Sequence, residues 1–293
     1  MEKICAVIID TFDGQLLTRH AVNQVLKMPN ISYVYTFCEF PIVGDSRVRF
    51  IKIPKLKNTA EYNHFIINQL YAYIHQFEES HCLIFQWDGF PLSPKKWNDI
   101  FLDYDYIGAP WYSRDVHSCP VDMAIVGNSG FCLASIKLFK TIINLGIVHN
   151  MNNHINDDVI ICIKNRAQLE EAGIKFAPPQ IASSFSEEER LSRDSFCFNS
   201  LGFHAAYNFP YVFSESEIIL FLHELYDRLG SNHLVFHFFL NSCAIKSYRN
   251  LIKIIIKNKE KHLLIKNALF MGPHSQHICN FCSEEGIDLS SFR

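Results

Sequence analysis

The stretch Ile-Cys-Ala-Val-Ile-Ile (residues 4–9) is a continuous apolar run that ends at Asp10. Such a run is typical of a strand that is buried on both faces, as in a parallel sheet. A second short apolar run, residues 82–85, is followed directly by Gln-Trp-Asp-Gly-Phe (residues 86–90). Ligands of open α/β sheets bind beyond the carboxyl ends of the strands, which is where Asp10 and Asp88 would lie. We therefore expect a ligand at this edge of the sheet.

The neighbouring segments alternate between helix and strand patterns. Apolar and aromatic residues at helical spacing predict helices over residues 19–28 and 59–77, and Thr59 is the expected cap of the second helix. Short apolar runs predict further strands over residues 31–37 and 49–53. This alternation indicates an α/β domain with a largely parallel sheet.

The composition is that of a folded chain. Of its 293 residues, 48% are hydrophobic, and 25 Phe and 12 Tyr argue against disorder. The net charge of −3 exerts no global pull toward nucleic acid, and we expect no nucleic acid partner. The first residues do not read as a signal peptide, and no apolar stretch reaches the roughly 18 to 20 residues of a membrane span. Ten scattered cysteines, several in apolar runs, predict reduced thiols in a cytoplasmic protein.

The pattern of the chain changes near residue 210. We expect an α/β domain over residues 1–210 and a helical extension over residues 211–293. Within the extension, helical spacing predicts helices over residues 217–229 and 251–269, with a turn at residues 230–232 between them.

Two features of the extension indicate candidate partners. The segment 249–266 carries six Lys or Arg and one Glu, with isoleucines and a leucine that can share one helical face. Such a helix can lie on the anionic inner face of the membrane, or it can pack against the protein with its basic face in solvent. A second group, of two histidines and two cysteines, could bind zinc, although the spacing of these residues is not that of a standard zinc finger. This group consists of His274, His277, Cys279 and Cys282.

Two segments of the first domain combine polar groups with glycine. Asp88, at a strand end and next to a glycine, could reach a divalent cation, because Mg²⁺ and Mn²⁺ take carboxylate and phosphate oxygens. The ordinary alternative is a turn that follows a strand. In residues 127–130 the flanking glycines would let Asn128 and Ser129 approach a sugar, or would simply form a turn.

Two further segments also have two interpretations. Asp157 and Asp158 precede an apolar run, so they would favour a helix start, or one of them would act as a general base for an acceptor hydroxyl. His204 follows Gly202-Phe203 late in the domain. A lone histidine is usually structural, and it would act as a metal ligand only close to Asp88.

Six segments taken together carry a resemblance. In chain order they are QWDGF (86–90), DYIGAPW (105–111), VGNSGFCL (126–133), DDV (157–159), FSEE (185–188) and GFH (202–204). The series, spanning about residues 60–205, resembles a bacterial family of unknown function whose members are regarded as candidate glycosyltransferases. That family is similar to the GT-A nucleotide-diphospho-sugar transferases. The resemblance implies a GT-A-like (Rossmann-like) mixed, mainly parallel sheet flanked by helices.

The resemblance also implies an activity. It is metal-dependent transfer of a sugar from a nucleotide-diphosphate donor, with a UDP-sugar favoured, to a glycan or lipid-linked acceptor hydroxyl in cell-surface polysaccharide biosynthesis. Mn²⁺ or Mg²⁺ would be held by Asp88 and His204. Gln86 stands where the first acid of the D-x-D motif is usual. In an inverting enzyme, Asp158 or its neighbour Asp157 would take the acceptor proton.

Donor and acceptor contacts are expected from residues spread over several segments, among which Trp111 would offer an apolar platform. They are Asp10, Tyr62, Asn63, Gln86, Asp88, Trp111, Asn128, Ser129 and Gly130. Two other functions stay open. A catalytically inactive sugar- or nucleotide-binding module would account for Gln86. A nucleotidyltransferase would need a glycine-rich basic phosphate loop, which we do not find near the N-terminus.

Overall fold

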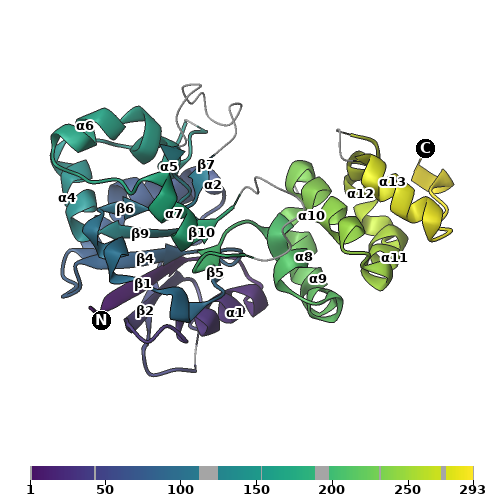
Figure 1. Cartoon of the computed structure of the whole chain (residues 1–293), viewed down its shortest axis with the longest axis horizontal. Coiled ribbons are helices and arrows are strands. Elements are labelled where there is room, and N and C mark those ends of the chain that lie inside the picture. The colour runs from purple at the N-terminus through teal and green to yellow at the C-terminus, as the bar shows by residue number, and fades with distance from the viewer. Residues whose placement is uncertain are drawn as a thin grey trace. The chain divides into compact units, whose positions relative to one another are not determined.

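A computed structural model of the chain describes residues 2–42, 44–111, 125–152, 154–188, 198–230, 232–271 and 275–292. Contacts within the chain divide it into two compact units, Met1–His204 and Ala205–Arg293 (Figure 1). The strands are β1 (Ile4–Ile9), β2 (Ile31–Cys38), β3 (Val48–Lys52), β4 (His81–Phe85), β5 (Phe90–Pro91), β6 (Tyr106–Ile107), β7 (Pro110–Trp111), β8 (Ile125–Val126), β9 (Phe131–Ser135), β10 (Ser186–Glu187) and β11 (Gly202–Phe203).

The helices are α1 (Leu16–Val25), α2 (Thr59–His64), α3 (Tyr71–Ile74), α4 (Ile136–Asn144), α5 (Asp157–Val159), α6 (Arg166–Glu171), α7 (Pro179–Phe185), α8 (Phe209–Val212), α9 (Glu215–Leu229), α10 (His233–Ile245), α11 (Arg249–Lys257), α12 (His262–Phe270) and α13 (Ser275–Glu284). Two π-helical segments, Phe65–Gln69 and Ile160–Lys164, continue α2 and α5 respectively. The domain boundary that we expect near residue 210 stays a prediction.

The first unit is built on a six-stranded sheet of order β3-β2-β1-β4-β9-β6. Strands β1, β2, β3 and β4 run parallel, whereas β9 is antiparallel to β4 and β6 is antiparallel to β9. Every residue of β1, β4 and β9 is buried, as expected for strands covered on both faces. The predicted α/β fold, with a mixed, mainly parallel sheet flanked by helices, is confirmed.

The expected helix over residues 59–77 is shorter and less regular than predicted. Its cap is Asn58 rather than Thr59, because the Asn58 side chain accepts a hydrogen bond of 3.0 Å from the backbone N–H of Glu61. Asn58 has extended backbone, so Thr59 is already the first helical residue. The α-helix then gives way to the π-helical segment Phe65–Gln69 before α3 ends at Ile74.

The second unit contains helices α8 to α13 and corrects two expectations. Helix α10 was not predicted, because most of its residues are apolar and it lacks the polar face that reveals a helix in sequence. The single helix expected over residues 251–269 is wrong, since α11 and α12 are separate. The break lies at Asn258, whose extended backbone lets its side chain cap the N–H of Glu260 at 3.0 Å.

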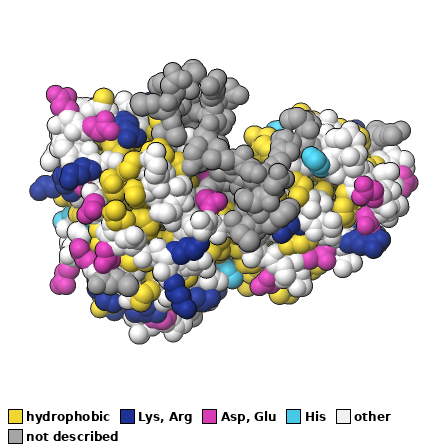
Figure 2. All heavy atoms as spheres, viewed as in Figure 1, with side chains coloured by type: hydrophobic (Ala, Val, Ile, Leu, Met, Phe, Trp, Pro, Cys, Tyr) yellow, Lys and Arg dark blue, Asp and Glu magenta, His cyan; other side chains and the backbone are white. Residues whose placement is uncertain are grey.

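The apolar side of the basic segment 249–266 is used inside this unit. Leu251, Ile252 and Ile255 are each 0% exposed. Helix packing therefore accounts for these three residues, whereas Leu263 of the same segment is 71% exposed. Contact with a membrane stays a prediction. Within the part of the chain that the structure describes, no helix is long and apolar enough to cross a membrane. On the face seen in Figure 2, acidic and basic side chains are interspersed.

The cysteines that the structure describes are all free thiols. Cys5, Cys82, Cys132 and Cys162 are buried in the first unit, in line with their positions in apolar runs. The two remaining cysteines of the sequence, 119 and 197, lie outside the described residues.

Asp105 ties three parts of the first unit together. Its carboxylate accepts hydrogen bonds from Ser135 Oγ (2.7 Å), Lys137 Nζ (3.1 Å) and the backbone N–H of Lys175 (2.9 Å). Burial alone would raise the pKa of Asp105, but these hydrogen bonds and the charge of Lys137 lower the pKa below its usual value. In the DYIGAPW segment, the acid therefore has a structural role.

We expect Asp105→Asn to lower the free energy of unfolding by about 1–3 kcal/mol near neutral pH, because hydrogen bonds to a charged acceptor are lost. A folded-state pKa that is depressed stabilises above the unfolded value of about 3.9, and this contribution disappears as pH falls through the folded pKa. Denaturant titrations at neutral and acidic pH check this, with the exposed Asp103→Asn as control. A difference between Asp105→Asn and wild type that does not shrink in acid would contradict it.

Candidate functional site

The candidate site begins where β4 ends. Gln86 and Gly89 exchange backbone hydrogen bonds of 3.2 and 3.1 Å and so close a tight turn. The turn holds Gln86 and Asp88 at the carboxyl edge of the parallel strands, and β5 follows it and pairs with β11. The ordinary interpretation of Asp88-Gly89 as a turn is therefore correct, and the same turn positions a carboxylate at the ligand-binding edge.

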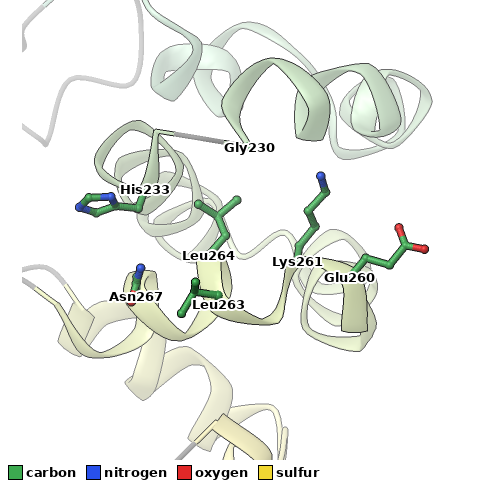
Figure 3. A pocket seen from close by; sticks show the side chains of 7 residues that line it. All are labelled: Gly230, His233, Glu260, Lys261, Leu263, Leu264 and Asn267. Atoms are coloured by element: carbon green, nitrogen blue, oxygen red, sulfur yellow. The ribbon is translucent and has the colours of Figure 1, made fainter.

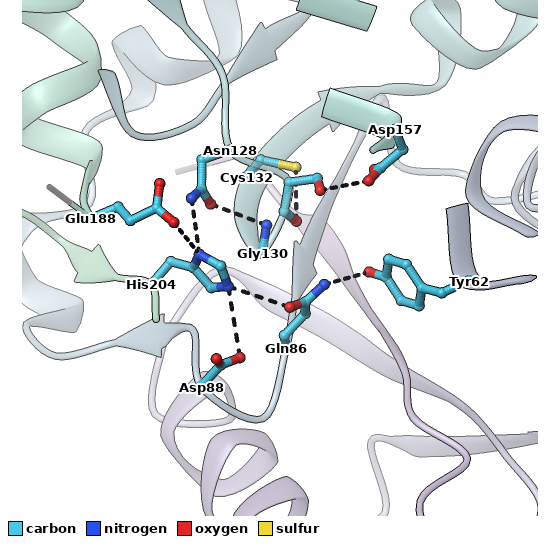
Figure 4. A network of polar contacts seen from close by, with 10 residues as sticks. Tyr62, Gln86, Asp88, Asn128, Gly130, Cys132, Asp157, Glu188 and His204 are labelled. Atoms are coloured by element: carbon cyan, nitrogen blue, oxygen red, sulfur yellow. Dashed lines mark hydrogen bonds and ion pairs between the residues drawn. The ribbon is translucent and has the colours of Figure 1, made fainter. Parts of the chain in front are cut away.

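His204 reaches this turn from the other end of the unit. It directly follows β11, and its backbone N–H donates to the carbonyl of Glu187 at 3.0 Å. Its Nε2 lies 3.7 Å from Asp88 Oδ1 and 3.3 Å from Gln86 Oε1, while Nδ1 lies 3.1 Å from Glu188 Oε1 (Figure 4). The structure thus brings Asp88 and His204 together, as a shared site would require.

Two glycines make room for the imidazole ring of His204. A Cβ on Gly130 would lie 2.0 Å from His204 Nε2, and a Cβ on Gly89 would lie 3.0 Å from its Cδ2. On Gly89, a Cβ would also lie 2.5 Å from the carbonyl oxygen of Gly130. Contacts this short exclude any side chain at these positions. Gly130 of VGNSGFCL is therefore required by the ring, and Gly89 of QWDGF is required by the ring and by the backbone of Gly130.

Two carboxylates surround the ring and favour its charged form. Burial lowers the pKa of His204, but the charges of Asp88 and Glu188 and the hydrogen bond to Glu188 outweigh it and raise the pKa to about 9. Burial likewise raises the pKa of Glu188, yet the hydrogen bond and charge of His204, with hydrogen bonds from Asn128 and Trp111, bring the pKa below its usual value. The group therefore behaves as an ion cluster near neutral pH.

Sequence reasoning missed Glu188 as a member of the site. The residue occurs in the FSEE segment, where its only signal is its place in the ordered series of motifs. An acid next to a second acid ordinarily reads as solvent-exposed, whereas the side chain of Glu188 is only 18% exposed.

Asn128 approaches the same ring from the loop before β9. It is 2% exposed and adopts φ 63, a left-handed conformation that asparagine tolerates better than most residues. Its Oδ1 accepts from the N–H of Gly130 at 3.1 Å, and its Nδ2 lies 2.9 Å from Nδ1 of His204. The loop conformation thus directs an amide into the site.

Ser129 points the other way, to the acidic pair. Its hydroxyl donates to Asp157 Oδ1 at 2.9 Å, and Asp157 Oδ2 has no hydrogen-bond partner among the described residues. Burial and the charge of Asp158 raise the pKa of Asp157 to about 7. Neither Asp157 nor Asn156 caps the helix through a side-chain bond, so capping does not account for the acid at position 157.

Tyr62 and Gln86 connect the two parts of the site. The Gln86 Nε2 donates to the hydroxyl of Tyr62 at 2.9 Å, while its Oε1 faces His204. Burial, together with the charge of Asp157, raises the pKa of Tyr62 well above its usual value, so the phenol is neutral. Asn63 instead binds the backbone of Ile155 and the side chain of Asn156, at 3.3 and 3.4 Å.

Asp10 and Trp111, which the sequence predicts to contact the donor or acceptor, have other partners in the structure. The Asp10 carboxylate accepts from the N–H of Phe12 and from the hydroxyl of Thr18 at the start of α1. Trp111 is 4% exposed, a Cβ on Gly127 would touch its ring, and its side chain hydrogen-bonds Glu188. Trp111 therefore supports the site from within, and the structure does not present it as an open platform.

A groove of about 330 Å³ lies in the second unit and contains none of the predicted site residues (Figure 3). Its cation, Lys261, lies 3.8 Å from Asp227, and Leu263 and Leu264 supply apolar walls. The lining residues are Gly230, His233, Glu260, Lys261, Leu263, Leu264 and Asn267.

Metal ligands are sparse in the described part of the chain. Among those residues, no group of three or more His, Cys, Asp or Glu is placed to hold a metal. Of the proposed zinc ligands, His274 lies outside the described residues, and Cys279 and Cys282 lie on α13, where Cys279 Sγ contacts the carbonyl of Leu269 at 3.6 Å. A cation near His204 would therefore need ligands from a substrate in addition to those of the protein.

The chain belongs to the family described as "Protein of unknown function (DUF5672)", whose model matches residues 45–204. No curated protein matches it. Among solved structures it is similar to the galactosyltransferase LgtC in complex with donor and acceptor sugar analogues, at 13% identity and a TM-score of 0.44 over 69% of this chain and 87% of that one.

It is also similar to a glycosyltransferase involved in glycosylation of the major capsid of PBCV-1, at 12% identity and a TM-score of 0.42 over 70% of this chain and 93% of that one. A third similar structure is 4-diphosphocytidyl-2C-methyl-D-erythritol synthase from Anaerococcus prevotii, at 11% identity and a TM-score of 0.32 over 60% and 86% of the two chains.

The contact between Gly130 and the His204 ring gives a test of the site geometry. Gly130→Ala should lower the free energy of unfolding by about 1–3 kcal/mol, because the new methyl group overlaps the ring. In a His204→Ala background the same change should have a much smaller effect, since the overlapping atoms are gone. A double-mutant cycle by denaturant unfolding measures this coupling.

Gly146→Ala is the matched control for this cycle. Its φ of +66 strains an alanine, but a Cβ there meets no atom within 4 Å. Its effect should be the same with either residue at position 204. Equal effects of Gly130→Ala in the two backgrounds would show that the ring does not lie on Gly130.

Proposed function

We propose that the chain is a metal-dependent glycosyltransferase that moves a sugar from a nucleotide-diphosphate donor to a hydroxyl of a glycan or lipid-linked acceptor. The observation that carries this proposal is the convergence of Gln86, Asp88 and His204 at the carboxyl edge of β4. The six ordered sequence segments support it, because each of them contributes a residue to one network of hydrogen bonds and ion pairs. DYIGAPW joins it through Trp111, which hydrogen-bonds Glu188.

The side chains at this edge fit a divalent cation. A carboxylate oxygen of Asp88 and an amide oxygen of Gln86 face the ring of His204, and such oxygens suit Mn²⁺ or Mg²⁺. The imidazole would join them once the cation displaces the proton from Nε2. The other ring nitrogen of His204 hydrogen-bonds a carboxylate, as is usual for a histidine that binds metal. Donor phosphates would complete the coordination, and the cation would neutralise the charge of the leaving diphosphate.

The remaining residues divide between donor and acceptor. Asn128 and the Ser129–Gly130 backbone would position sugar hydroxyls, since the loop brings polar groups into the site beside His204. The Tyr62 hydroxyl fixes the amide of Gln86 so that its oxygen faces His204. Asp10 directly follows β1 at the same sheet edge, where the nucleoside of a UDP-sugar, the favoured donor, would lie.

Within the acidic pair, Asp157 is the better candidate for the general base. Its unpartnered Oδ2 is buried, and a pKa of about 7 suits proton transfer near neutral pH. Asp158 accepts from the N–H of Val159 at 2.8 Å, and its charge helps to raise the pKa of Asp157. An inverting transfer would use this carboxylate to take the acceptor proton, whereas a retaining transfer would not need it.

Replacing Asp88 tests the cation site. Asp88→Asn should reduce Mn²⁺-dependent consumption of a UDP-sugar by about 10²–10³-fold, because a charged group that would stabilise the developing diphosphate is removed. Release of UDP with and without Mn²⁺ is the measurement, and the exposed Asp103→Asn is the matched control. Activity that needs no metal and survives Asp88→Asn would overturn the assignment. Donor binding without turnover would favour an inactive binding module, and pyrophosphate release from a nucleoside triphosphate would favour a nucleotidyltransferase.

The acidic pair predicts a pH profile. A general base works when deprotonated, so kcat/KM should rise with pH through a pKa of about 7. Asp157→Asn should remove this rise and lower kcat/KM by about 10²–10⁴-fold. Asp158→Asn should keep the rise but move it to lower pH, because the charge that raises the pKa of Asp157 is gone. An unchanged profile in Asp157→Asn would exclude this base.

A further inference from the structure

We propose that Glu188 is a positioning residue whose carboxylate fixes the His204 ring with Nε2 directed at Asp88 and Gln86. The role rests on the proposed function, since it presents one ligand of the cation site. The orientation of the His204 ring can also be tested by itself, without a metal.

The backbone places the two residues side by side before their side chains meet. Strands β10 and β11 run parallel, with Ser186 opposite Gly202 and Glu187 opposite Phe203. Glu188 and His204 are the next residues along each strand, and the hydrogen bond from the His204 N–H to the Glu187 carbonyl continues the pairing. Strand register therefore places Glu188 opposite His204, within reach of its side chain.

Three hydrogen-bond donors meet at the Glu188 carboxylate. They belong to Trp111 of DYIGAPW, Asn128 of VGNSGFCL and His204 of GFH. Glu188 and His204 are 18% and 17% exposed, so water competes little for these bonds. A carboxylate that receives several donors in such surroundings is strongly held and in turn holds its donors in place.

The orientation of the ring suits Glu188, Asp88 and Gln86. With Nδ1–H donating to Glu188, the opposite nitrogen faces Asp88 and Gln86, at 3.7 and 3.3 Å. Turning the ring over would place carbon atoms against these polar groups. The backbones at Gly89 and Gly130 lie against the ring and prevent it from moving toward them. In the alternative arrangement Nδ1 carries no proton and accepts a hydrogen bond from Asn128. Glu188 would then have no hydrogen bond from His204, so the experiment must distinguish the two arrangements.

The experiment compares Glu188→Gln with Glu187→Gln in the full-length protein. The first change keeps size and acceptor but removes the charge. The second is the matched control, because Glu187 accepts only from backbone N–H groups of Asn199 and Ser200, at 2.8 and 3.1 Å, among the contacts described. Thermal unfolding should show both variants folded.

The first readout is the ¹H–¹⁵N spectrum of the histidine side chains at a fixed, near-neutral pH, with His204→Ala used to assign His204. Wild type and Glu187→Gln should show a protonated, hydrogen-bonded Nδ1, and in Glu188→Gln its proton should move upfield because a neutral acceptor binds it more weakly. An unprotonated Nδ1 in wild type, or an identical signal in Glu188→Gln, would overturn the positioning role.

The second readout is the affinity for Mn²⁺ alone, measured by electron paramagnetic resonance. Glu188→Gln should bind Mn²⁺ about 10–100-fold more weakly than wild type, as expected when the partner of a ligating histidine is altered. If wild type binds Mn²⁺ and Glu188→Gln binds it with equal affinity, Glu188 does not position His204 as a metal ligand. Absence of protein-bound Mn²⁺ in wild type, both alone and with UDP added to supply phosphate oxygens, would overturn the metal part of the proposed function. If the Nδ1 signal is as expected, the positioning of His204 would still be established.

Discussion

The imidazole of His204 lies between the carboxylates of Asp88 and Glu188, and the geometry of the candidate site depends on this contact. Three charged groups that are each less than a fifth exposed are held there, which is unfavourable unless they neutralise one another and fill their hydrogen bonds. The arrangement therefore requires close approach. Glycine at positions 89 and 130 permits it, and the pairing of β5 and β10 with β11 enforces it.

This contact also accounts for the departure from an acidic D-x-D motif at Gln86. The amide of Gln86 donates to the Tyr62 hydroxyl and offers its oxygen to His204. A carboxylate at the same place would lose the donor toward Tyr62 and add a third negative charge around the ring. An amide, in contrast, still provides an oxygen that a cation can bind. The glutamine is thus compatible with a cation site and does not require that the site be inactive.

The sequence predicts the parts of the fold that follow from local pattern. The apolar runs at residues 4–9 and 82–85 have the continuous burial of central strands, so they are recognisable without neighbours. Helix α10 is not recognisable in this way, because a helix that is apolar nearly all round carries no 3.6-residue signal. The break at Asn258 was missed for a related reason, since apolar residues continue on both sides of it.

The site could be predicted only as separate pieces. Asp88, His204 and the acidic pair stand out as polar groups at element ends or beside glycine. Glu188 does not stand out, because its burial arises from the pairing of β10 with β11. No local sequence pattern reveals that pairing. The buried position of Trp111 is also a product of packing, against a glycine of another segment. Contacts of this kind depend on the tertiary fold, which no local pattern encodes.

Several local rules are broken in or next to residues of the candidate site, and this clustering is itself an argument for function. Asn128 has a left-handed backbone, and Ala205, which follows His204, has φ 82, a strained value for alanine. The π-helical segments Phe65–Gln69 and Ile160–Lys164 follow Tyr62 and Asp157, and such segments are frequent at functional sites. A fold selected for stability alone would have little reason to gather these conformations together with a buried, partly unpaired acid. Their coincidence with the charged cluster is what a binding or catalytic site would produce.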